Sequence, residues 1–208
     1  MTTTLIIARH GNTFGPDDTP TRVGARTDLP LVEKGHEQAK AIGRYLNDNR
    51  LIPDVIYTSN LKRTIETAKI AVKESGVTNP IYPLDIFNEI DYGPDENKTE
   101  DEVIARIGEQ AIKDWDEHAT VPDGWVVDPK EIIRSWHDFA EQISAHDDNE
   151  TVLVVTSNGI ARFAPYITGD FEGFNAEHSI KLSTGALGIF KCEHGVWHAE
   201  DWNFRPQP

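Results

Sequence analysis

The sequence predicts an α/β protein: a three-layer α/β/α sandwich with a mostly parallel central sheet and a helical insertion, at about residues 90–150, that lies over the functional site. Short apolar runs of strand length alternate with longer stretches whose apolar residues recur at helical spacing, which is typical of α/β domains. The runs at residues 5–8 and 152–155 are apolar at every position, as in strands buried on both faces. The chain has 208 residues, enough to bury one large core, so we expect a single domain over residues 1–208.

The composition is ordinary for a soluble protein, with 38% hydrophobic and 26% charged residues. No apolar run approaches the length of a membrane-spanning helix, about 20 residues. Residues 1–4 lead straight into the first strand and leave no room for a signal peptide. The single cysteine, Cys192, cannot form an internal disulfide. We therefore expect a cytoplasmic protein with no membrane partner.

The net charge of −15 disfavours binding to nucleic acid or to an anionic membrane surface. Nearly all of this charge lies in residues 89–150, which hold nineteen Asp or Glu and five Lys or Arg, a net of −14. The remaining residues sum to −1. The part of the chain that carries Arg9, Arg63 and Arg162 is therefore nearly neutral, and an anion site there is electrostatically feasible.

The first strand, at residues 5–8, is followed directly by Arg9, His10 and Gly11. Ligands of open α/β sheets bind at the edge where the strands end, so these side chains lie where a ligand is expected. Gly11 would let the backbone approach such a ligand closely. Residues 14–30, rich in glycine and proline, are expected to form a long loop, and loops of this length in compact domains are often functional.

The next helix is predicted from Ala39, Ile42, Gly43 and Leu46, which recur at helical spacing. A second strand at residues 54–58 follows it, and Ser59 or Asn60 then offers an N-cap to another helix. The apolar face of that helix comprises Leu61, Ile65, Ala68 and Val72.

Arg63 lies in the first turn of this second helix and off its apolar face. A cation is disfavoured at a helix N-terminus, because the helix dipole is positive there. An arginine at that place is better explained by an anion bound in front of it.

A third extended segment is predicted at residues 81–84, and one helix is predicted over residues 99–118. Asp128 begins the next helix, because an N-cap residue, a proline at the first position and a glutamate at the third are typical of a helix start. We expect the tryptophans of this insertion to belong to the core rather than to a ligand platform.

Two final strands, at residues 185–192 and 196–202, are predicted to form a hairpin. His194 and His198, with Glu193 and Glu200 nearby, could suggest a metal site. Their spacing matches no recognised set of metal ligands, so a solvated hairpin is the preferred interpretation and no metal is expected.

Several of these segments resemble the histidine phosphatase superfamily, also called the phosphoglycerate mutase-like family. Arg9-His10-Gly11 resembles the first signature of the family, and residues 23–39 resemble the loop and helix that follow it. Residues 58–68, with Arg63, resemble its second motif.

The resemblance continues in the acidic segment and in the third motif. Glu89 and Glu96 match two glutamates of the family by their spacing from Gly93. Residues 157–162 resemble the third motif except at Ser157, where the family carries a second catalytic histidine. This departure bears directly on the chemistry.

The resemblance implies a role for each matching residue. His10 would be a neutral nucleophile that accepts a phosphoryl group, and Arg9 and Arg63 would bind the phosphate and disfavour a charged imidazole. Glu89, with a pKa raised by its acidic neighbourhood, would protonate the leaving alcohol and then activate water. The candidates for substrate binding are Asn12, Arg26 and Asn158.

With serine in place of the second histidine, position 157 offers a neutral hydroxyl instead of a charged hydrogen-bond donor. Removing one hydrogen-bond donor to a transition state costs about 2.7–4 kcal/mol. The loss of the histidine would therefore slow catalysis by roughly 10² to 10³. The hydroxyl of Ser157, the amide of Asn158 and backbone N–H groups at the following helix start could supply part of what is missing.

These observations favour a metal-independent phosphatase that hydrolyses a small phosphate monoester through a phosphohistidine on His10. One alternative is a phosphotransferase of the phosphoglycerate mutase type. Another is a non-catalytic member of the fold that binds a phosphorylated ligand. In each case the partner is a small phosphorylated molecule, with no cofactor, because guanidinium groups neutralise the phosphate.

Overall fold

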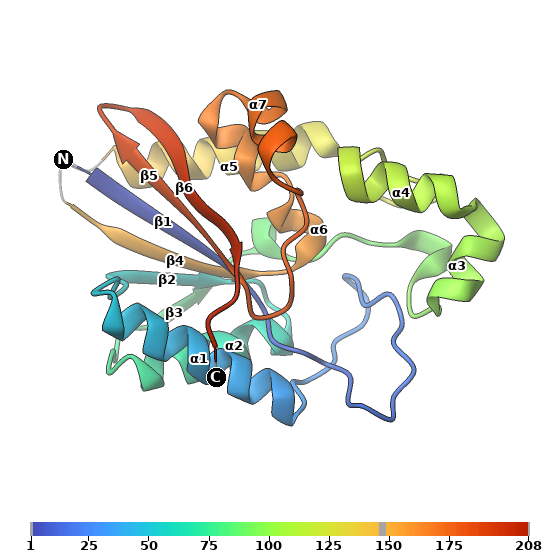
Figure 1. Cartoon of the computed structure of the whole chain (residues 1–208), viewed down its shortest axis with the longest axis horizontal. Coiled ribbons are helices and arrows are strands. Elements are labelled where there is room, and N and C mark those ends of the chain that lie inside the picture. Colours follow the sequence, from blue (N-terminus) through green and yellow to red (C-terminus); the bar gives the residue numbers. More distant parts are fainter. Residues whose placement is uncertain (1, 146–148, 208) are drawn as a thin grey trace.

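The computed structural model describes residues 2–145 and 149–207, and its strands form one sheet in the order β3-β2-β4-β1-β5-β6 (Figure 1). Neighbouring strands from β3 to β1 run parallel, whereas β5 runs antiparallel to β1 and β6. The strands are β1 (Thr2–Arg9), β2 (Val55–Thr58), β3 (Ile81–Pro83), β4 (Thr151–Thr156), β5 (Leu187–Glu193) and β6 (Val196–Phe204). The predicted mostly parallel sheet is confirmed.

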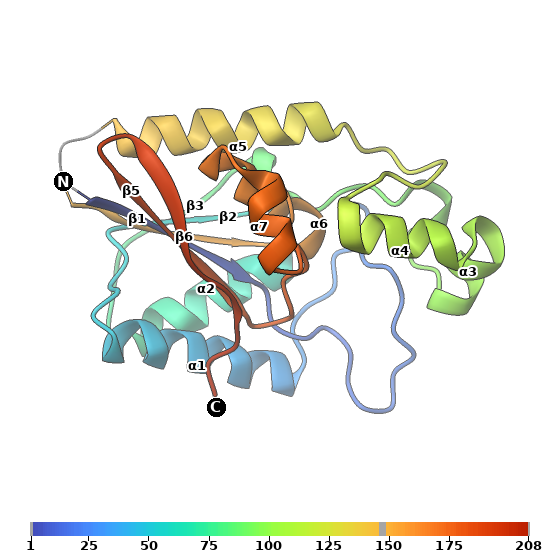
Figure 2. The same cartoon turned by 45° about the horizontal axis from the view of Figure 1, so that its top comes forward.

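Helices cover both faces of this sheet (Figures 1 and 2). Alternate residues of the central strands face opposite ways: Leu5 and Val154 pack on one side, Ile6 and Leu153 on the other. One face carries α1 (Glu33–Asp48) and α2 (Lys62–Glu74), and the other carries α5 (Pro129–Ser144) and α7 (Phe171–Glu177). The predicted three-layer sandwich is therefore present, with α1 burying the predicted face around Ile42.

The insertion before β4 begins with α3 (Glu100–Ile107) and α4 (Glu109–His118), which extend beyond the sheet beside the loop at residues 14–30 (Figure 2). One continuous helix over residues 99–118 was the expectation, and it is wrong. Gly108 adopts a φ of 83°, a left-handed conformation that ends α3 and redirects the chain. The remaining short helices are α6 (Asn158–Ala161) and the 3₁₀ turns η1 (Asp85–Phe87), η2 (Gly93–Asp95) and η3 (Ala164–Thr168).

The later part of the insertion, α5, belongs to the covering layer of the sheet. Its predicted N-cap is confirmed, because the Asp128 carboxylate accepts from the backbone N–H groups of residues 130 and 131. On its buried face, the Phe139 ring lies 5.3 Å from Tyr57 and 5.0 Å from Phe87, measured between centroids. Trp136 is also buried in this layer, as predicted for the core.

The start of α2 differs from the prediction that Ser59 or Asn60 caps it. The N-cap position is Leu61, and its side chain makes no cap. Asn60 instead bonds to Asp85 and Asn88, which follow β3. The first free backbone N–H of the helix, at Lys62, donates to the Asp28 carboxylate of the long loop at 2.7 Å. A distant loop therefore caps this helix.

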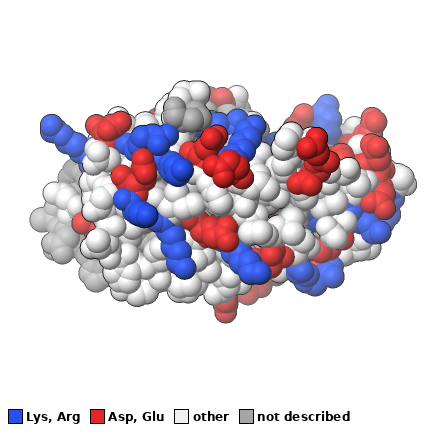
Figure 3. Space-filling model, turned by 90° about the horizontal axis from the view of Figure 1, so that it is seen from below, with Lys and Arg blue, Asp and Glu red and all other residues white. Residues whose placement is uncertain are grey.

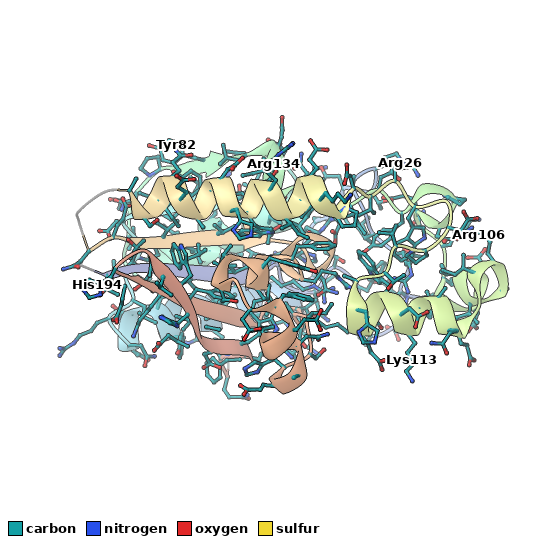
Figure 4. The ribbon with its side chains drawn as sticks, turned by 90° about the horizontal axis from the view of Figure 1, so that it is seen from above. Arg26, Tyr82, Arg106, Lys113, Arg134 and His194 are labelled. Carbon is teal, nitrogen blue, oxygen red and sulfur yellow. The ribbon has the colours of Figure 1, made fainter. Side chains whose placement is uncertain are left out.

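The predicted C-terminal hairpin is confirmed, with His194 and Gly195 at its turn. Their φ angles of 52° and 79° are both positive, as in a two-residue hairpin turn of type I′. His194 lies at the end of the molecule opposite Arg106 (Figure 4), and Glu200 pairs with Lys191 at 3.2 Å. Within residues 2–145 and 149–207, no group of three His, Cys, Asp or Glu is arranged to hold a metal ion.

Two further features concern the surface. No helix in the described ranges has both the length and the apolarity needed to cross a bilayer. Seen from the side of α1 and α2, basic and acidic side chains are intermixed (Figure 3).

Candidate active site

A cavity of 540 Å³ lies where the parallel strands β1 and β4 end. Arg9 pairs with Thr156 across these strands, so the residues that follow, His10 and Ser157, lie side by side. Of the predicted site residues, the cavity wall includes Arg9, His10, Asn12, Glu89 and Asn158. The topology therefore gathers side chains from segments far apart in the sequence at one sheet edge.

His10 lies in the cavity wall and is almost buried, with 6% of the residue exposed. One hydrogen bond orients its ring. Nδ1 lies 2.7 Å from the Gly11 carbonyl oxygen. A carbonyl only accepts, so Nδ1 carries the proton and Nε2 keeps its lone pair when the ring is neutral. Burial first, and then the charges of Arg9 and Arg63, hold the His10 pKa well below its usual value, against a smaller opposing effect of the Gly11 hydrogen bond.

This depressed pKa predicts a pH dependence of stability. The unfolded imidazole takes up a proton below pH 6.5, whereas the folded one stays neutral, so the unfolded state binds more protons and is favoured as the pH falls. Between pH 7 and pH 5 we expect this group to remove up to about 2 kcal/mol from the free energy of unfolding. Urea unfolding of the wild-type protein and of His10→Asn across this range measures the difference. Parallel curves for the two proteins would contradict the assignment.

Arg9 and Arg63 supply positive charge beside His10. Arg9 donates from Nη1 to the Leu182 carbonyl at 2.8 Å. Arg63 is fully buried and does not line the cavity; it donates to the Thr27 carbonyl at 2.8 Å and to the carbonyls of residues 23 and 24 at 3.3 Å. In the described ranges, the buried Nε atom of each arginine has no hydrogen-bond partner. Burial lowers both pKa values, yet the guanidinium groups remain charged at neutral pH.

Glu89 is buried at the cavity wall and is held by two backbone N–H groups. Its Oε1 accepts from Ile90 at 2.9 Å and its Oε2 from Gly159 at 3.1 Å. Burial raises the pKa of this carboxyl, and the opposing effects of Arg63, the two hydrogen bonds and Arg9 do not cancel it. A raised pKa favours the protonated form that a general acid needs.

Gly159 is required for this arrangement, because a Cβ atom there would lie 2.3 Å from Glu89 Oε1. Its N–H group was expected among those that replace the missing histidine. That expectation is wrong for this group, since it already donates to Glu89. The nearby Ser157 hydroxyl is fully buried and has no hydrogen-bond partner among the residues described.

Asn12 and Gly11 are held by the protein itself. Asn12 Oδ1 accepts from the Thr184 hydroxyl at 2.6 Å, which leaves its side-chain nitrogen as the donor at the cavity wall. Gly11 does approach another backbone closely, but that backbone is α1 rather than a ligand: a Cβ atom on Gly11 would lie 2.4 Å from the Gly35 carbonyl oxygen. The glycine is therefore explained by packing.

Arg26 lies outside the cavity, contrary to its predicted contact with an anionic substrate. Its Nε lies 3.1 Å from both Asp91 carboxylate oxygens, and its Nη2 donates to the Gly93 carbonyl at 2.6 Å. It lies toward the same end of the molecule as Arg106 (Figure 4). Glu96 holds the same loop by accepting from Gly24, Arg26 and Thr27. The negative charge of the Asp91 carboxylate offsets the positive charge of Arg26, so this arginine attracts an anionic ligand only weakly.

The comparison with known proteins agrees with this geometry. The family model described as "Histidine phosphatase superfamily (branch 1)" matches residues 5–205. The chain belongs to the histidine phosphatase superfamily. A 2,3-bisphosphoglycerate-dependent phosphoglycerate mutase of Arthrobacter sp. is 32% identical over 175 residues, covering 83% of this chain and 68% of the relative. A mutase of the same name from Bartonella quintana is 29% identical over 194 residues, covering 91% and 92%.

Solved structures of the same fold carry other names. Bacillus stearothermophilus YhfR matches with a TM-score of 0.77 and 25% identity, covering 97% of both chains. A mycobacterial glucosyl-3-phosphoglycerate phosphatase matches with a TM-score of 0.78 and 18% identity, covering 97% of this chain and 99% of that one. The sequence relatives of this superfamily member are thus named mutases, and the structures that share its fold include a phosphatase.

Sequence reasoning missed several polar residues of the cavity wall in this superfamily member, among them Arg22, Tyr92 and Lys181. Arg22 pairs with Glu100 at 2.8 Å. It comes from the long loop, and nothing in its local pattern singled it out. Arg162, which closes the segment that resembles the third motif, was placed by the sequence in the part of the chain suited to an anion site but was given no role, and it does line the cavity.

Proposed function

We propose that the protein is a metal-independent phosphatase that hydrolyses a small phosphate monoester through a phosphohistidine on His10. The observation that carries the proposal is the state of this side chain: a neutral imidazole with its Nε2 lone pair free, in a cavity wall shared with Arg9 and Glu89. Membership of the superfamily supports it. The proposed partner of the protein is this small phosphorylated substrate, and the proposed location of the protein is the cytoplasm.

The reaction would proceed in two steps. Nε2 of His10 attacks phosphorus, the bond between phosphorus and the ester oxygen breaks, and the Glu89 proton passes to that oxygen as the alcohol leaves. Water then attacks the phosphohistidine and gives its proton to the Glu89 carboxylate, while the electron pair of the P–N bond returns to Nε2. Inorganic phosphate and the starting protonation state result.

Positive charge stabilises the transferring group in both steps. Arg9 and Arg63 would carry out the neutralisation that metal ions perform in other phosphoryl-transfer sites. Asn12 and Asn158 would orient the substrate through their side-chain nitrogens, since their amide oxygens already accept from Thr184 and from the Leu182 N–H.

Ser157 takes the position of the second catalytic histidine of the superfamily in this proposal. Its place directly after β4, beside His10, supports the assignment. A neutral hydroxyl is a weaker donor than an imidazolium, and the missing donor would slow the reaction by roughly 10² to 10³. Turnover would be slow but measurable.

Ser157→Ala should separate stability from activity. We expect the free energy of unfolding to rise by about 1 kcal/mol, because the variant removes a buried hydroxyl without a partner, and phosphate release to fall about 2- to 10-fold. Ser75→Ala is the matched control: this serine is also buried, but its hydroxyl donates to the Val72 carbonyl, so its loss should destabilise. Destabilisation of equal size in both variants would show that Ser157 makes a bond in solution.

Two alternatives have their own support. The names of the sequence relatives favour a phosphoglycerate mutase-type phosphotransferase. The serine at position 157 favours a non-catalytic protein that binds a phosphorylated ligand, because such a protein needs no second histidine.

One assay distinguishes the three. The purified protein is incubated with a panel of phosphate esters, with His10→Ala as the background, and both inorganic phosphate and the interconversion of 3- and 2-phosphoglycerate are measured. We expect phosphate release above the His10→Ala background for at least one ester. Interconversion without release would favour the mutase, and thermal stabilisation by esters without either product would favour the binding protein.

A further inference from the structure

We propose that Gln38 is a positioning residue for the nucleophile: through the peptide group between Gly11 and Asn12, it fixes which ring nitrogen of His10 carries the proton. Thr67 assists it by holding the Gly11 N–H. The inference rests on the proposed function for the role of His10 as nucleophile. It names two buried side chains outside the cavity wall that keep Nε2 of His10 free to attack.

One peptide group connects Gln38 to the His10 ring. Its carbonyl oxygen, that of Gly11, lies 2.7 Å from His10 Nδ1. Its N–H, that of Asn12, donates to Gln38 Oε1 at 2.8 Å. Because a peptide group is a single resonance unit, a hydrogen bond donated by its N–H increases the negative charge on its carbonyl oxygen. Gln38 therefore strengthens the hydrogen bond that holds the proton on Nδ1.

The Gln38 side chain is itself firmly oriented. While Oε1 accepts from Asn12, Nε2 donates to the Thr184 carbonyl at 3.4 Å. The reversed amide would face a donor with a donor and an acceptor with an acceptor, so these neighbours define its orientation. Gly185, with a φ of 69°, packs directly against it: a Cβ atom there would lie 2.8 Å from Gln38 Cβ and 3.1 Å from its Cδ. Only 6% of Gln38 is exposed.

Thr67 holds the peptide group on the other side of Gly11. Its Oγ1 accepts from the Gly11 N–H at 3.1 Å and donates to the Arg63 carbonyl at 2.7 Å. Thr67 lies on α2 and Gln38 on α1, and both helices cover the same face of the sheet (Figures 1 and 2). The two peptide groups that flank Gly11 are thus each held by a buried side chain from this helical layer.

The position of the ring proton decides whether His10 can react. A neutral imidazole carries one ring proton, and only the nitrogen without it can attack phosphorus. The hydrogen bond made by one ring nitrogen determines the state of the other. A weaker acceptor at the Gly11 carbonyl would let the proton move to Nε2, and the nucleophilic lone pair would be lost from that atom.

Nitrogen-15 NMR of the histidine rings tests the inference without any substrate, because protonated and unprotonated ring nitrogens resonate at well-separated positions. The chain has eight histidines, and the signals missing from His10→Asn identify those of His10. We expect the wild-type protein to show a protonated Nδ1. Gln38→Met has a side chain of similar length that accepts no such hydrogen bond, and it should shift the Nδ1 signal toward the unprotonated position.

The kinetics of the same variant give a second readout. For Gln38→Met we expect kcat on the best phosphate ester to fall about 10- to 100-fold, the range known for groups that orient histidine ligands of metals. The KM should stay nearly unchanged, because Gln38 does not line the cavity. Gln38→Glu should restore the wild-type ring signals, since its carboxyl keeps an oxygen acceptor for the Asn12 N–H whether ionised or protonated. Gln142→Met, at an exposed position of α5, should change neither readout.

Thr67→Val keeps the inference testable if Gln38→Met does not fold. It removes the acceptor of the Gly11 N–H and should shift the Nδ1 signal in the same direction by a smaller amount. Thr64→Val is the matched control: Thr64 is also fully buried on α2, but its hydroxyl bonds to residues 59 and 61 rather than to Gly11. It should lower the melting temperature by a similar amount and leave the His10 signals in place.

The ring spectra separate this inference from the proposed function because they need no turnover. A shifted Nδ1 signal in Gln38→Met supports the inference even if the wild-type protein hydrolyses no ester. Unshifted signals in both Gln38→Met and Thr67→Val overturn it, and they leave the phosphatase in place if the wild type releases phosphate. An equal shift in Thr64→Val or Gln142→Met also overturns it, since general loosening of the fold would then explain the change.

Discussion

Replacing His10 by alanine is expected to lower phosphate release by a factor on the order of 10⁴ or more. The reason is that the proposed reaction has no other route: without Nε2, no covalent intermediate forms, and the remaining groups only bind and polarise the ester. A nucleophile and the groups that act with it accelerate the reaction as a unit, so removal of the nucleophile should abolish nearly all of the activity. Steady-state phosphate release on the best ester of the panel measures it.

The intermediate itself offers a second readout. Wild-type protein quenched in alkali during turnover should retain a phosphoryl group that is stable to base and labile to acid, as expected for phosphohistidine. His10→Asn should retain none, although its amide can still donate to the Gly11 carbonyl and so preserves the local hydrogen bond. A labelled His10→Asn protein, or undiminished turnover by the alanine variant, would exclude His10 as the nucleophile.

Glu89→Gln is expected to slow the cleavage of an alkyl phosphate by roughly 10² to 10⁴, the range of general acid catalysis. The same variant should cleave p-nitrophenyl phosphate nearly as fast as the wild type in the first step. The difference arises because an alkoxide needs a proton in order to leave and p-nitrophenolate does not. The amide of glutamine is close in shape to the carboxyl and keeps an acceptor for one of the two backbone N–H groups at residues 90 and 159.

The measurement must isolate the first step, because Glu89 also serves as the base in the second. The burst of p-nitrophenol in a rapid-mixing experiment does so, alongside single-turnover release from the alkyl ester. Glu131→Gln is the control, since Glu131 is a surface residue of α5 with 66% of its side chain exposed. Equal losses for both esters in the first step would argue against a proton donor at Glu89.

Much of the fold was predictable because it depends on local pattern. Uninterrupted apolar runs identified β1 and β4, and the periodicity of α1 and α5 identified their buried faces. The convergence of His10 and Asn158 followed from the same source, since each comes after a parallel strand and such strands end at one sheet edge.

The remaining features depend on contacts between distant residues. Asp28 caps a helix that begins 34 residues later, and Glu96 holds a loop about 70 residues earlier. No local pattern encodes such bonds, so the N-cap of α2 and the partner of Arg26 could not be predicted. The sequence shows a glycine at position 108 but does not show that it adopts a positive φ and ends the helix, because glycine also occurs inside helices.

The bonds of Arg63 have a consequence for how the protein can diversify. One side chain fastens the backbone at residues 23–27, whereas residues 16–20, in the same loop, are exposed. Insertions or exchanges in the exposed stretch, which reaches the cavity wall at Pro20, would change the loop without disturbing the hydrogen bonds of Arg63. Changes between Val23 and Thr27 would disturb the backbone carbonyls that hold Arg63, whose charge is part of the proposed function. New substrate preferences are therefore most accessible to evolution, and to engineering, through five neighbouring positions of the outer loop.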